Sequence, residues 1–129
     1  MKPESEGYLG KAQDCLARAR INLRTGLGDD AGRNAYLAGY HAAQALIIEK
    51  TAKIAKTHSG ARSEFAKIAK DDPRIDKEFP SFLGWAYDLK NVADYLFGPG
   101  TPVPLDRAAD AIATATRFIE CIDGILKGE

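Results

Sequence analysis

The sequence is short of valine and cysteine, and each shortage argues against a class of protein. Valine occurs only twice, whereas alanine occurs 21 times. Alanine loses no side-chain entropy in a helix, while β-branched residues favour strands, so this imbalance predicts an all-α fold. The two cysteines, Cys15 and Cys121, stand near opposite ends of the chain without metal-type spacing. We therefore expect two reduced thiols of a cytosolic protein and not a disulfide framework.

Long apolar runs are also lacking. No stretch approaches the ~20 apolar residues that span a membrane, and the first residues are polar and acidic, unlike a signal peptide. These features predict a cytoplasmic protein without membrane contact. A length of 129 residues suits one domain, residues 1–129, with a single hydrophobic core.

Motifs for metals and cofactors are missing too. A di-iron site in a helical bundle needs Glu-x-x-His pairs on facing helices, and the sequence contains none. Neither His41 nor His58 has a second ligand at helical spacing. The glycine-rich stretches at residues 26–28 and 98–100 lack the strand–loop–helix context of a phosphate-binding loop. The sequence therefore predicts neither a metal nor a cofactor.

Apolar residues recur with the 3.6-residue period of a helix in five segments. The expected helices cover approximately residues 4–25, 29–56, 61–70, 80–96 and 105–126. Asp29 and Asp30 are good N-cap residues for the second helix, and the turn at residues 57–60 is expected to follow its end. Small residues crowd residues 35–43, so a neighbour can approach closely and we expect this helix at the centre. The pattern predicts an antiparallel up-and-down bundle of four to five helices.

The fourth predicted helix has an apolar stripe and a polar remainder. Its stripe consists of Phe82, Trp85, Leu89, Val92 and Leu96. Its other side carries Tyr87, Lys90, Asn91 and Asp94. Lys90 and Asp94 are four residues apart and therefore neighbours on a helix surface. Two interpretations are open: a salt-bridged face in solvent, or a polar cluster that faces a groove between helices or subunits.

Charge is balanced over the whole chain but not along it. The net charge is zero, yet residues 1–70 carry five more basic than acidic residues. The basic side chains concentrate in one region, at Lys50, Lys53, Lys56, Arg62 and Lys67. They fit an electrostatic footprint for RNA. They also fit a solvated surface, because lysines at the end of a helix are favoured by its dipole whether or not anything binds.

Three blocks of the sequence resemble the small stand-alone HEPN proteins of prokaryotes. Residues 35–46 are similar to the family's Ala-Tyr-Tyr-Ala-x-Phe-His-Ala-Ala-x-Ala-Leu signature. Residues 57–60, followed by Phe65, resemble its Thr-His turn, and residues 89–95 resemble its Leu-Arg-x-x-Ala-Asp-Tyr segment. The resemblance implies a HEPN bundle, commonly a homodimer with a cleft between subunits. It also implies a nucleotidyltransferase partner in a toxin–antitoxin pair, or metal-independent ribonuclease activity.

The ribonucleases of this family use an arginine followed four to six residues later by a histidine. Lys90 stands at the arginine position, Asn91 at the polar position after it, and Asp94 or Tyr95 at the histidine position. Histidine exchanges protons near neutral pH because its unperturbed pKa is about 6.5. Aspartate is normally ionised and tyrosine protonated at that pH, and lysine lacks the bidentate fork of arginine. We therefore expect little or no ribonuclease activity of the family type.

These observations leave three hypotheses for function. The first is a HEPN-like binding module, non-catalytic or weakly active, that partners a nucleotidyltransferase or RNA and forms a homodimer. The second is a ribonuclease with an unconventional centre built from Lys90, Asn91, Asp94 and Tyr95. The third is a structural protein–protein interaction module. His41, a lone histidine among alanines, is expected to be a hydrogen-bonded core residue.

Overall fold

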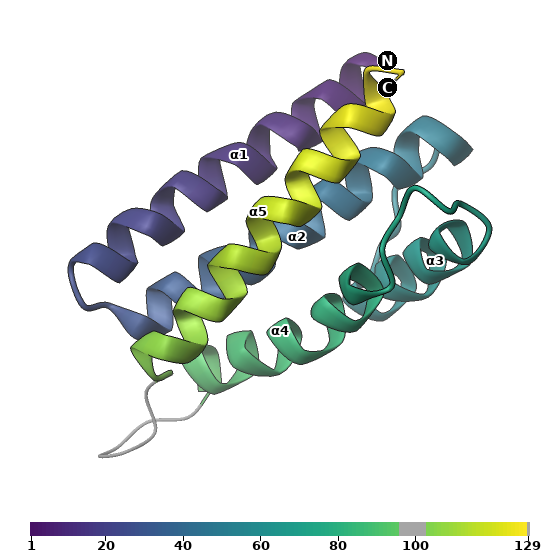
Figure 1. Cartoon of the computed structure of the whole chain (residues 1–129). Coiled ribbons are helices and arrows are strands. Elements are labelled where there is room, and N and C mark those ends of the chain that lie inside the picture. Colours follow the sequence, from purple (N-terminus) through teal and green to yellow (C-terminus); the bar gives the residue numbers. More distant parts are fainter. Residues whose placement is uncertain (96–102, 129) are drawn as a thin grey trace.

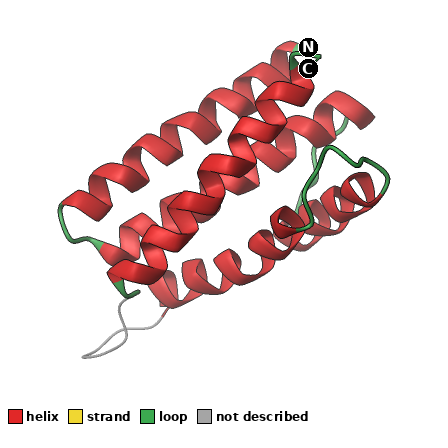
Figure 2. Cartoon of the chain, viewed as in Figure 1, coloured by secondary structure: helices red, strands yellow, loops and turns green. Residues whose placement is uncertain are grey.

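The protein is a bundle of helices in the computed structural model, which describes residues 1–95 and 103–128 (Figure 1). The helices are α1 (Pro3–Arg24), α2 (Gly28–Thr51), α3 (His58–Lys70), α4 (Glu78–Tyr95) and α5 (Leu105–Leu126). Every regular element in these residues is a helix (Figure 2), which confirms the all-α prediction. Within the described ranges no helix is long and apolar enough to cross a membrane.

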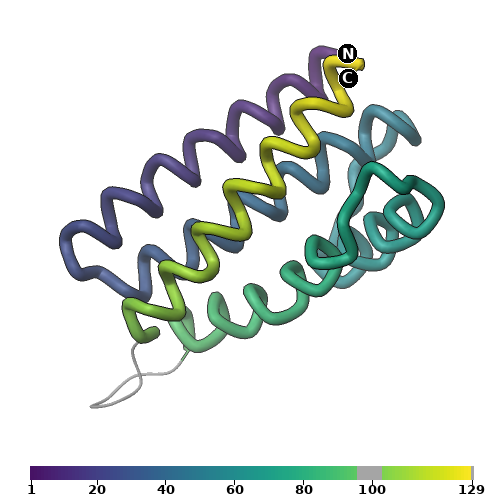
Figure 3. The backbone as a smooth tube through the Cα atoms, viewed as in Figure 1, coloured from purple at the N-terminus to yellow at the C-terminus, as the bar shows by residue number. Residues whose placement is uncertain are grey.

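The four long helices alternate in direction along the chain, and the short α3 comes between α2 and α4 in the sequence (Figure 3). The chain therefore starts and ends at the same end of the bundle, where the beginning of α1 lies beside the end of α5. Helix α2 contacts each of the four other helices. The predicted up-and-down bundle and the central place of α2 are both confirmed.

Small residues on α2 let the other helices approach its backbone. A Cβ atom added at Gly39 would lie 2.5 Å from the Phe82 ring, and 3.6 Å from the Phe118 ring. The core aromatic residues gather around Phe118 of α5, whose ring centroid lies 5.0 Å from that of Phe65 and 4.9 Å from that of Phe79. These aromatic rings thus join α3, α4 and α5 in one layer, which packs against Gly39 of α2.

Helix α2 ends at Thr51 and not near residue 56 as the sequence pattern suggested. Ala52 follows in the left-handed conformation, with φ of 61°. The buried Gln44 holds the next segment: its side-chain nitrogen donates to the Ala55 carbonyl over 2.9 Å, and its oxygen accepts from the Ala55 backbone nitrogen over 3.3 Å. The segment from residue 52 to 57 is therefore fastened to the side of α2 instead of continuing it.

Other helix boundaries also differ from the sequence prediction. Thr57 is not part of a turn that ends α2 but the N-cap of α3, because its hydroxyl accepts a hydrogen bond from the Gly60 backbone nitrogen over 2.9 Å. Helix α2 begins at Gly28, and Asp29 does not cap it but accepts from the Val103 backbone nitrogen. Helix α4 begins at Glu78, two residues earlier than expected.

The predicted apolar stripe of α4 is partly wrong. Phe82 and Leu89 are buried as expected, whereas Trp85 and Val92 are only half-buried. The remaining stripe member, Leu96, lies outside the described residues. The buried set instead includes Phe79, Leu83 and Ala86, so the face that enters the core is shifted around the helix. This shift turns Tyr87 toward the neighbouring helices.

Replacing Gly39 by alanine tests the close approach of α4 to α2. We expect Gly39→Ala to lower the free energy of unfolding by about 1–3 kcal/mol, because the new methyl group overlaps a buried ring. Gly10→Ala is the matched control, since α1 has open space at that position. It is expected to be neutral or to stabilise by up to about 1 kcal/mol through helix propensity. Urea unfolding measures both, and equal effects of the two variants would contradict the packing.

Candidate functional site

A cluster of aromatic and histidine side chains joins three helices. Its members are Tyr36 and Tyr40 of α2, His58 of α3 and Tyr87 of α4, and we call them the His58 cluster. The His58 ring centroid lies 4.5 Å from that of Tyr40, 5.6 Å from that of Tyr36 and 5.4 Å from that of Tyr87. His58 is the first residue of α3, so the Thr57 cap that starts this helix also places the imidazole.

The His58 imidazole is hydrogen-bonded on one side. The Tyr36 hydroxyl and His58 Nδ1 are 2.7 Å apart. Tyr36 is fully buried, and burial raises the pKa of its hydroxyl group above the ordinary value. The pKa of His58 is lowered, first by burial and then by the positive charges of Lys90 and Arg62. These surroundings therefore favour the neutral form of His58.

Two cationic side chains lie against Tyr87. The Arg62 guanidinium carbon is 4.7 Å from the centre of the Tyr87 ring, and Lys90 Nζ is 5.9 Å from it. Arg62 Nε is buried and has no hydrogen-bond partner within the described part of the chain. The His58 cluster thus sits beside two positive charges, one from α3 and one from α4. Sequence reasoning had assigned Arg62 to an exposed basic surface and had left Tyr87 on an outer polar face.

His41 does not match the expected hydrogen-bonded core histidine. It is half-buried, and its Nδ1 atom is buried without a hydrogen-bond partner among residues 1–95 and 103–128. Its ring lies 5.9 Å from the Tyr8 ring and 5.6 Å from the Tyr40 ring. The pKa of His41 is lowered, chiefly by burial and then by the positive charge of Lys11. Aromatic packing surrounds this side chain instead.

The predicted contact between Lys90 and Asp94 is confirmed, and it belongs to a larger network. Lys90 Nζ lies 2.7 Å from one Asp94 oxygen. The other Asp94 oxygen lies 2.6 Å from Nε of Arg33 on α2, and Arg33 also binds Asp30 over 2.6 Å. The Lys90 and Asp94 side chains are only 17% and 21% exposed. The polar face of α4 is therefore tied to α2 by ion pairs.

Asn91 and Tyr95, the other two candidate catalytic residues, lie at a groove. Together with Tyr87 and Val92 they line an open hollow of about 480 Å³ on the surface of α4. Tyr95 is 69% exposed, and Lys90 Nζ lies 5.8 Å from its ring. The structure thus brings Lys90, Asp94 and Tyr95 close together, and Asn91 borders the same groove.

The predicted nucleic-acid-binding residues divide into two groups. Lys50, Lys53, Lys56 and Lys67 are exposed, whereas Arg62 is half-buried and packs on Tyr87. Lys50 shares a surface hollow with Asp71, Asp72 and Arg74, and Lys67 lies 4.0 Å from Glu64. Acidic neighbours therefore offset part of this basic surface.

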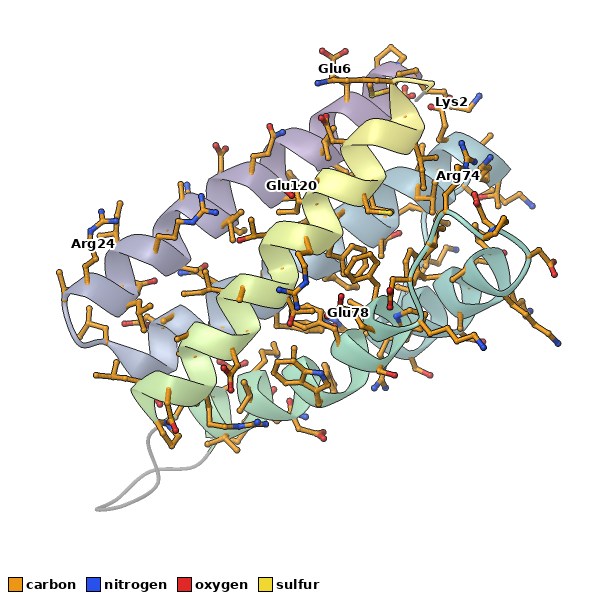
Figure 4. All side chains as sticks on the ribbon, viewed as in Figure 1. Lys2, Glu6, Arg24, Arg74, Glu78 and Glu120 are labelled. Atoms are coloured by element: carbon orange, nitrogen blue, oxygen red, sulfur yellow. The ribbon has the colours of Figure 1, made fainter. Side chains whose placement is uncertain are left out.

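Arg24 of α1 lies far from the basic surface around Lys50. Figure 4 shows Arg24 at the end of α1, on the opposite side of the bundle from Lys2 and Arg74. Lys50 shares its hollow with Arg74, so it lies at the far end from Arg24. A helix of 24 residues such as α2 is about 35 Å long. The surplus of positive charge in residues 1–70 is thus spread over the molecule.

Metal ligation is not supported by the geometry. Within the described residues, no three His, Cys, Asp or Glu side chains are arranged to hold a metal ion. Cys15 is a buried free thiol and Cys121 a half-buried one. Burial raises the pKa of both thiols, so neither is an activated nucleophile.

The Asp94 network predicts a pH-dependent contribution to stability. Burial by itself raises the pKa of Asp94, but hydrogen bonds from Lys90 and Arg33 outweigh it, so that the folded pKa is lowered. The contribution is therefore present above the unfolded pKa of about 3.9 and is lost as the pH falls through the lower folded value. We expect Asp94→Asn to lower the free energy of unfolding by about 1 kcal/mol at pH 7.

Urea unfolding at pH 7 and near pH 2–3 measures this difference, which should shrink at the acidic end. Asp88→Asn is the matched control, because Asp88 is an exposed carboxylate of the same helix and forms no ion pair within the described residues. A pH-independent effect of Asp94→Asn, or an equal effect of Asp88→Asn, would contradict the network.

Comparisons with known proteins agree with this architecture and with the three blocks noted in the sequence. The family model of the HEPN domain matches residues 5–125. A protein of Methanocaldococcus jannaschii that is named as a candidate toxin is 27% identical over 128 residues, which are 98% of this chain and 92% of the relative. Since the family model covers nearly the whole chain, the chain belongs to the HEPN domain family.

Proposed function

We propose that the protein is a non-catalytic HEPN module that works by binding, as the partner of a nucleotidyltransferase in a toxin–antitoxin pair. The absence of catalysis is inferred from one observation, the double ion pair of Asp94. Asp94, which with Tyr95 stands at the histidine position of the motif, binds both Lys90 and Arg33 through its carboxylate. In the free protein Lys90, the cation that would balance a phosphate, is paired with Asp94, and neither Asp94 nor Tyr95 is an imidazole.

The energetics of the ion pairs strengthen this argument. RNA cleavage through Lys90 requires its ammonium group to leave Asp94 and contact the scissile phosphate. Both side chains are about four-fifths buried, and hydrogen bonding to Asp94 raises the pKa of Lys90, although burial opposes it. A charged hydrogen bond in partly desolvated surroundings contributes more than one in bulk water. The network therefore favours a structural role for Lys90 in the free protein.

The partner half of the proposal rests on the relative and on the exposed part of α4. The relative named as a candidate toxin matches nearly the whole chain, which favours a toxin–antitoxin context here as well. Tyr95 is the most exposed of the large hydrophobic side chains in the described residues, and it borders the α4 groove. Exposed aromatic residues are enriched in protein interfaces. We assign this groove to contact with the nucleotidyltransferase or with the second subunit of a homodimer.

The same groove keeps a ribonuclease as the second candidate function. Lys90, Asp94 and Tyr95 are close together and Asn91 lies beside them, so RNA could reach them from the groove. In that case the exposed lysines at positions 50, 53, 56 and 67 would hold the RNA backbone. Asp94 or Tyr95 would then have to exchange the proton, which requires a large shift of an ordinary pKa.

A cleavage assay separates the two candidates. We expect wild-type protein, incubated with total RNA in the presence of EDTA, to leave the RNA intact. The double variant Lys90→Ala/Asp94→Ala is the comparison. Cleavage by the wild type that disappears in the double variant would overturn the non-catalytic proposal and place an active centre on α4. Cleavage that persists in the double variant would point to a contaminating nuclease.

A binding assay tests the partner. The tagged chain is co-expressed with each minimal nucleotidyltransferase from the same genome. We expect one of these nucleotidyltransferases to co-elute with the chain in size-exclusion chromatography. Tyr95→Arg should weaken this complex because it introduces a charge at the groove. Ile21→Arg is the control, since it adds the same charge at a similarly exposed apolar residue of α1. The partner proposal fails if no nucleotidyltransferase co-elutes.

A further inference from the structure

Arg62 is an arginine without an acidic partner. It lies in the first half of α3 and its side chain faces Tyr87 of α4. None of the ion pairs within the described residues includes it, and its Nε atom is buried and unbonded there. A buried donor of this kind is normally satisfied by protein, water or ligand. The cation–π contact with Tyr87 holds the guanidinium carbon but gives the Nε–H no acceptor.

Two further basic groups lie around the same ring. His58, one helical turn before Arg62, has its ring 5.4 Å from that of Tyr87, and Lys90 Nζ lies 5.9 Å from the Tyr87 ring centre. Tyr36 occupies His58 Nδ1, so Nε2 is the ring nitrogen left to face a ligand. Helices α3 and α4 thus bring a guanidinium, an imidazole and an ammonium group around one tyrosine.

Asp94 allows the ammonium group to change partner. Its two oxygens are divided, one binding Lys90 and the other binding Arg33. If Lys90 turned toward an anion, Arg33, which also binds Asp30, would still bind Asp94, and the carboxylate would not be left unpaired. The network therefore supplies a positive charge that a ligand can recruit.

We propose that Arg62, His58 and Lys90 form a phosphate-binding site beside Tyr87, which takes inorganic phosphate or the terminal phosphate of a phosphomonoester. Arginine matches this ligand because its planar fork donates two parallel hydrogen bonds to phosphate oxygens. The half-buried positions of Arg62, His58 and Lys90 strengthen the attraction relative to bulk water. The groove next to Tyr87 offers space for whatever the phosphate is attached to. The site goes beyond the proposed function, since it requires neither RNA cleavage nor a protein partner.

Binding of a dianion has a specific consequence for His58. In the free protein the positive charges of Lys90 and Arg62, together with burial, lower the pKa of this histidine. A phosphate between these groups offsets their positive charges and therefore raises the pKa of His58. The pKa of His41 depends chiefly on burial and then on Lys11 and His58, so it serves as an internal reference within the same molecule.

The experiment is an NMR titration of both histidine rings with inorganic phosphate, against sodium chloride at the same ionic strength. We expect phosphate to raise the pKa of His58 and to move that of His41 much less. Arg62→Gln should weaken phosphate binding about tenfold, the loss of one strong charged hydrogen bond, and Arg62→Lys should restore part of it. Lys70→Gln is the matched control, because it removes the same charge from the exposed far end of α3.

These outcomes test the phosphate-binding site independently of the proposed function. Equal weakening by Lys70→Gln and Arg62→Gln would reduce the effect to general electrostatics and overturn the site, as would equal responses of His41 and His58. Circular dichroism of each variant checks that it is folded, and the Arg62→Lys variant keeps the test decisive if Arg62→Gln unfolds.

A second binding measurement identifies the molecule that carries the phosphate. It compares a 5′-phosphorylated RNA dinucleotide with its 5′-hydroxyl form. If the dinucleotide binds more tightly than inorganic phosphate, and does so only when it carries the 5′-phosphate, the ligand is the end of a nucleic acid. If it binds no more tightly than inorganic phosphate, the ligand is free phosphate.

Discussion

The contact between Gly39 and the ring of Phe82 sets the distance between α2 and α4, and the candidate site depends on that distance. A larger residue at position 39 would push α4 outward, since an added Cβ atom would lie 2.5 Å from the ring. Tyr87 reaches Tyr36, and Asp94 reaches Arg33, only because α4 lies this close to α2. The missing side chain of one glycine in the core therefore controls the geometry of polar groups along the length of α4.

A second constraint places α3. The amide of Gln44 pairs with both backbone groups of Ala55 and fastens the link after α2. Thr57 then caps α3, so the first residue of that helix, His58, falls against Tyr36 and Tyr40. A buried glutamine that imitates backbone pairing thus fixes where a helix starts, and this start decides which side chains meet the imidazole.

The fold was predictable from the sequence to a larger extent than the site. The ratio of alanine to valine and the 3.6-residue period reflect local preferences, and these gave the five helices. The contact between Lys90 and Asp94 was also predictable because both residues lie on one helix. Arg33 was missed as the other partner of Asp94, since 61 residues separate them and no local pattern marks the pair. The end of α2 was misplaced because a tertiary hydrogen bond from Gln44 overrides a helical pattern.

The inward packing of Arg62 was missed for a related reason. It falls in a segment with a surplus of basic residues, between Lys56 and Lys67, and charge density along the chain does not show which side chain turns inward. His41 was predicted to be hydrogen-bonded from its place among small residues, but small neighbours offer few acceptors. Long-range polar contacts therefore mark the limit of what residue spacing shows in this protein.

The shared carboxylate of Asp94 also bears on how such a chain can change over evolution. Arginine at position 90 together with histidine at position 94 would recreate the arginine-to-histidine spacing of the family's ribonucleases. The same exchange would leave Arg33 with Asp30 alone and would place its guanidinium beside the new imidazole, where a positive charge discourages protonation. A substitution at position 94 therefore changes the surroundings of a side chain on α2 as well as on α4. The effect of such a change depends on which residue stands at position 33.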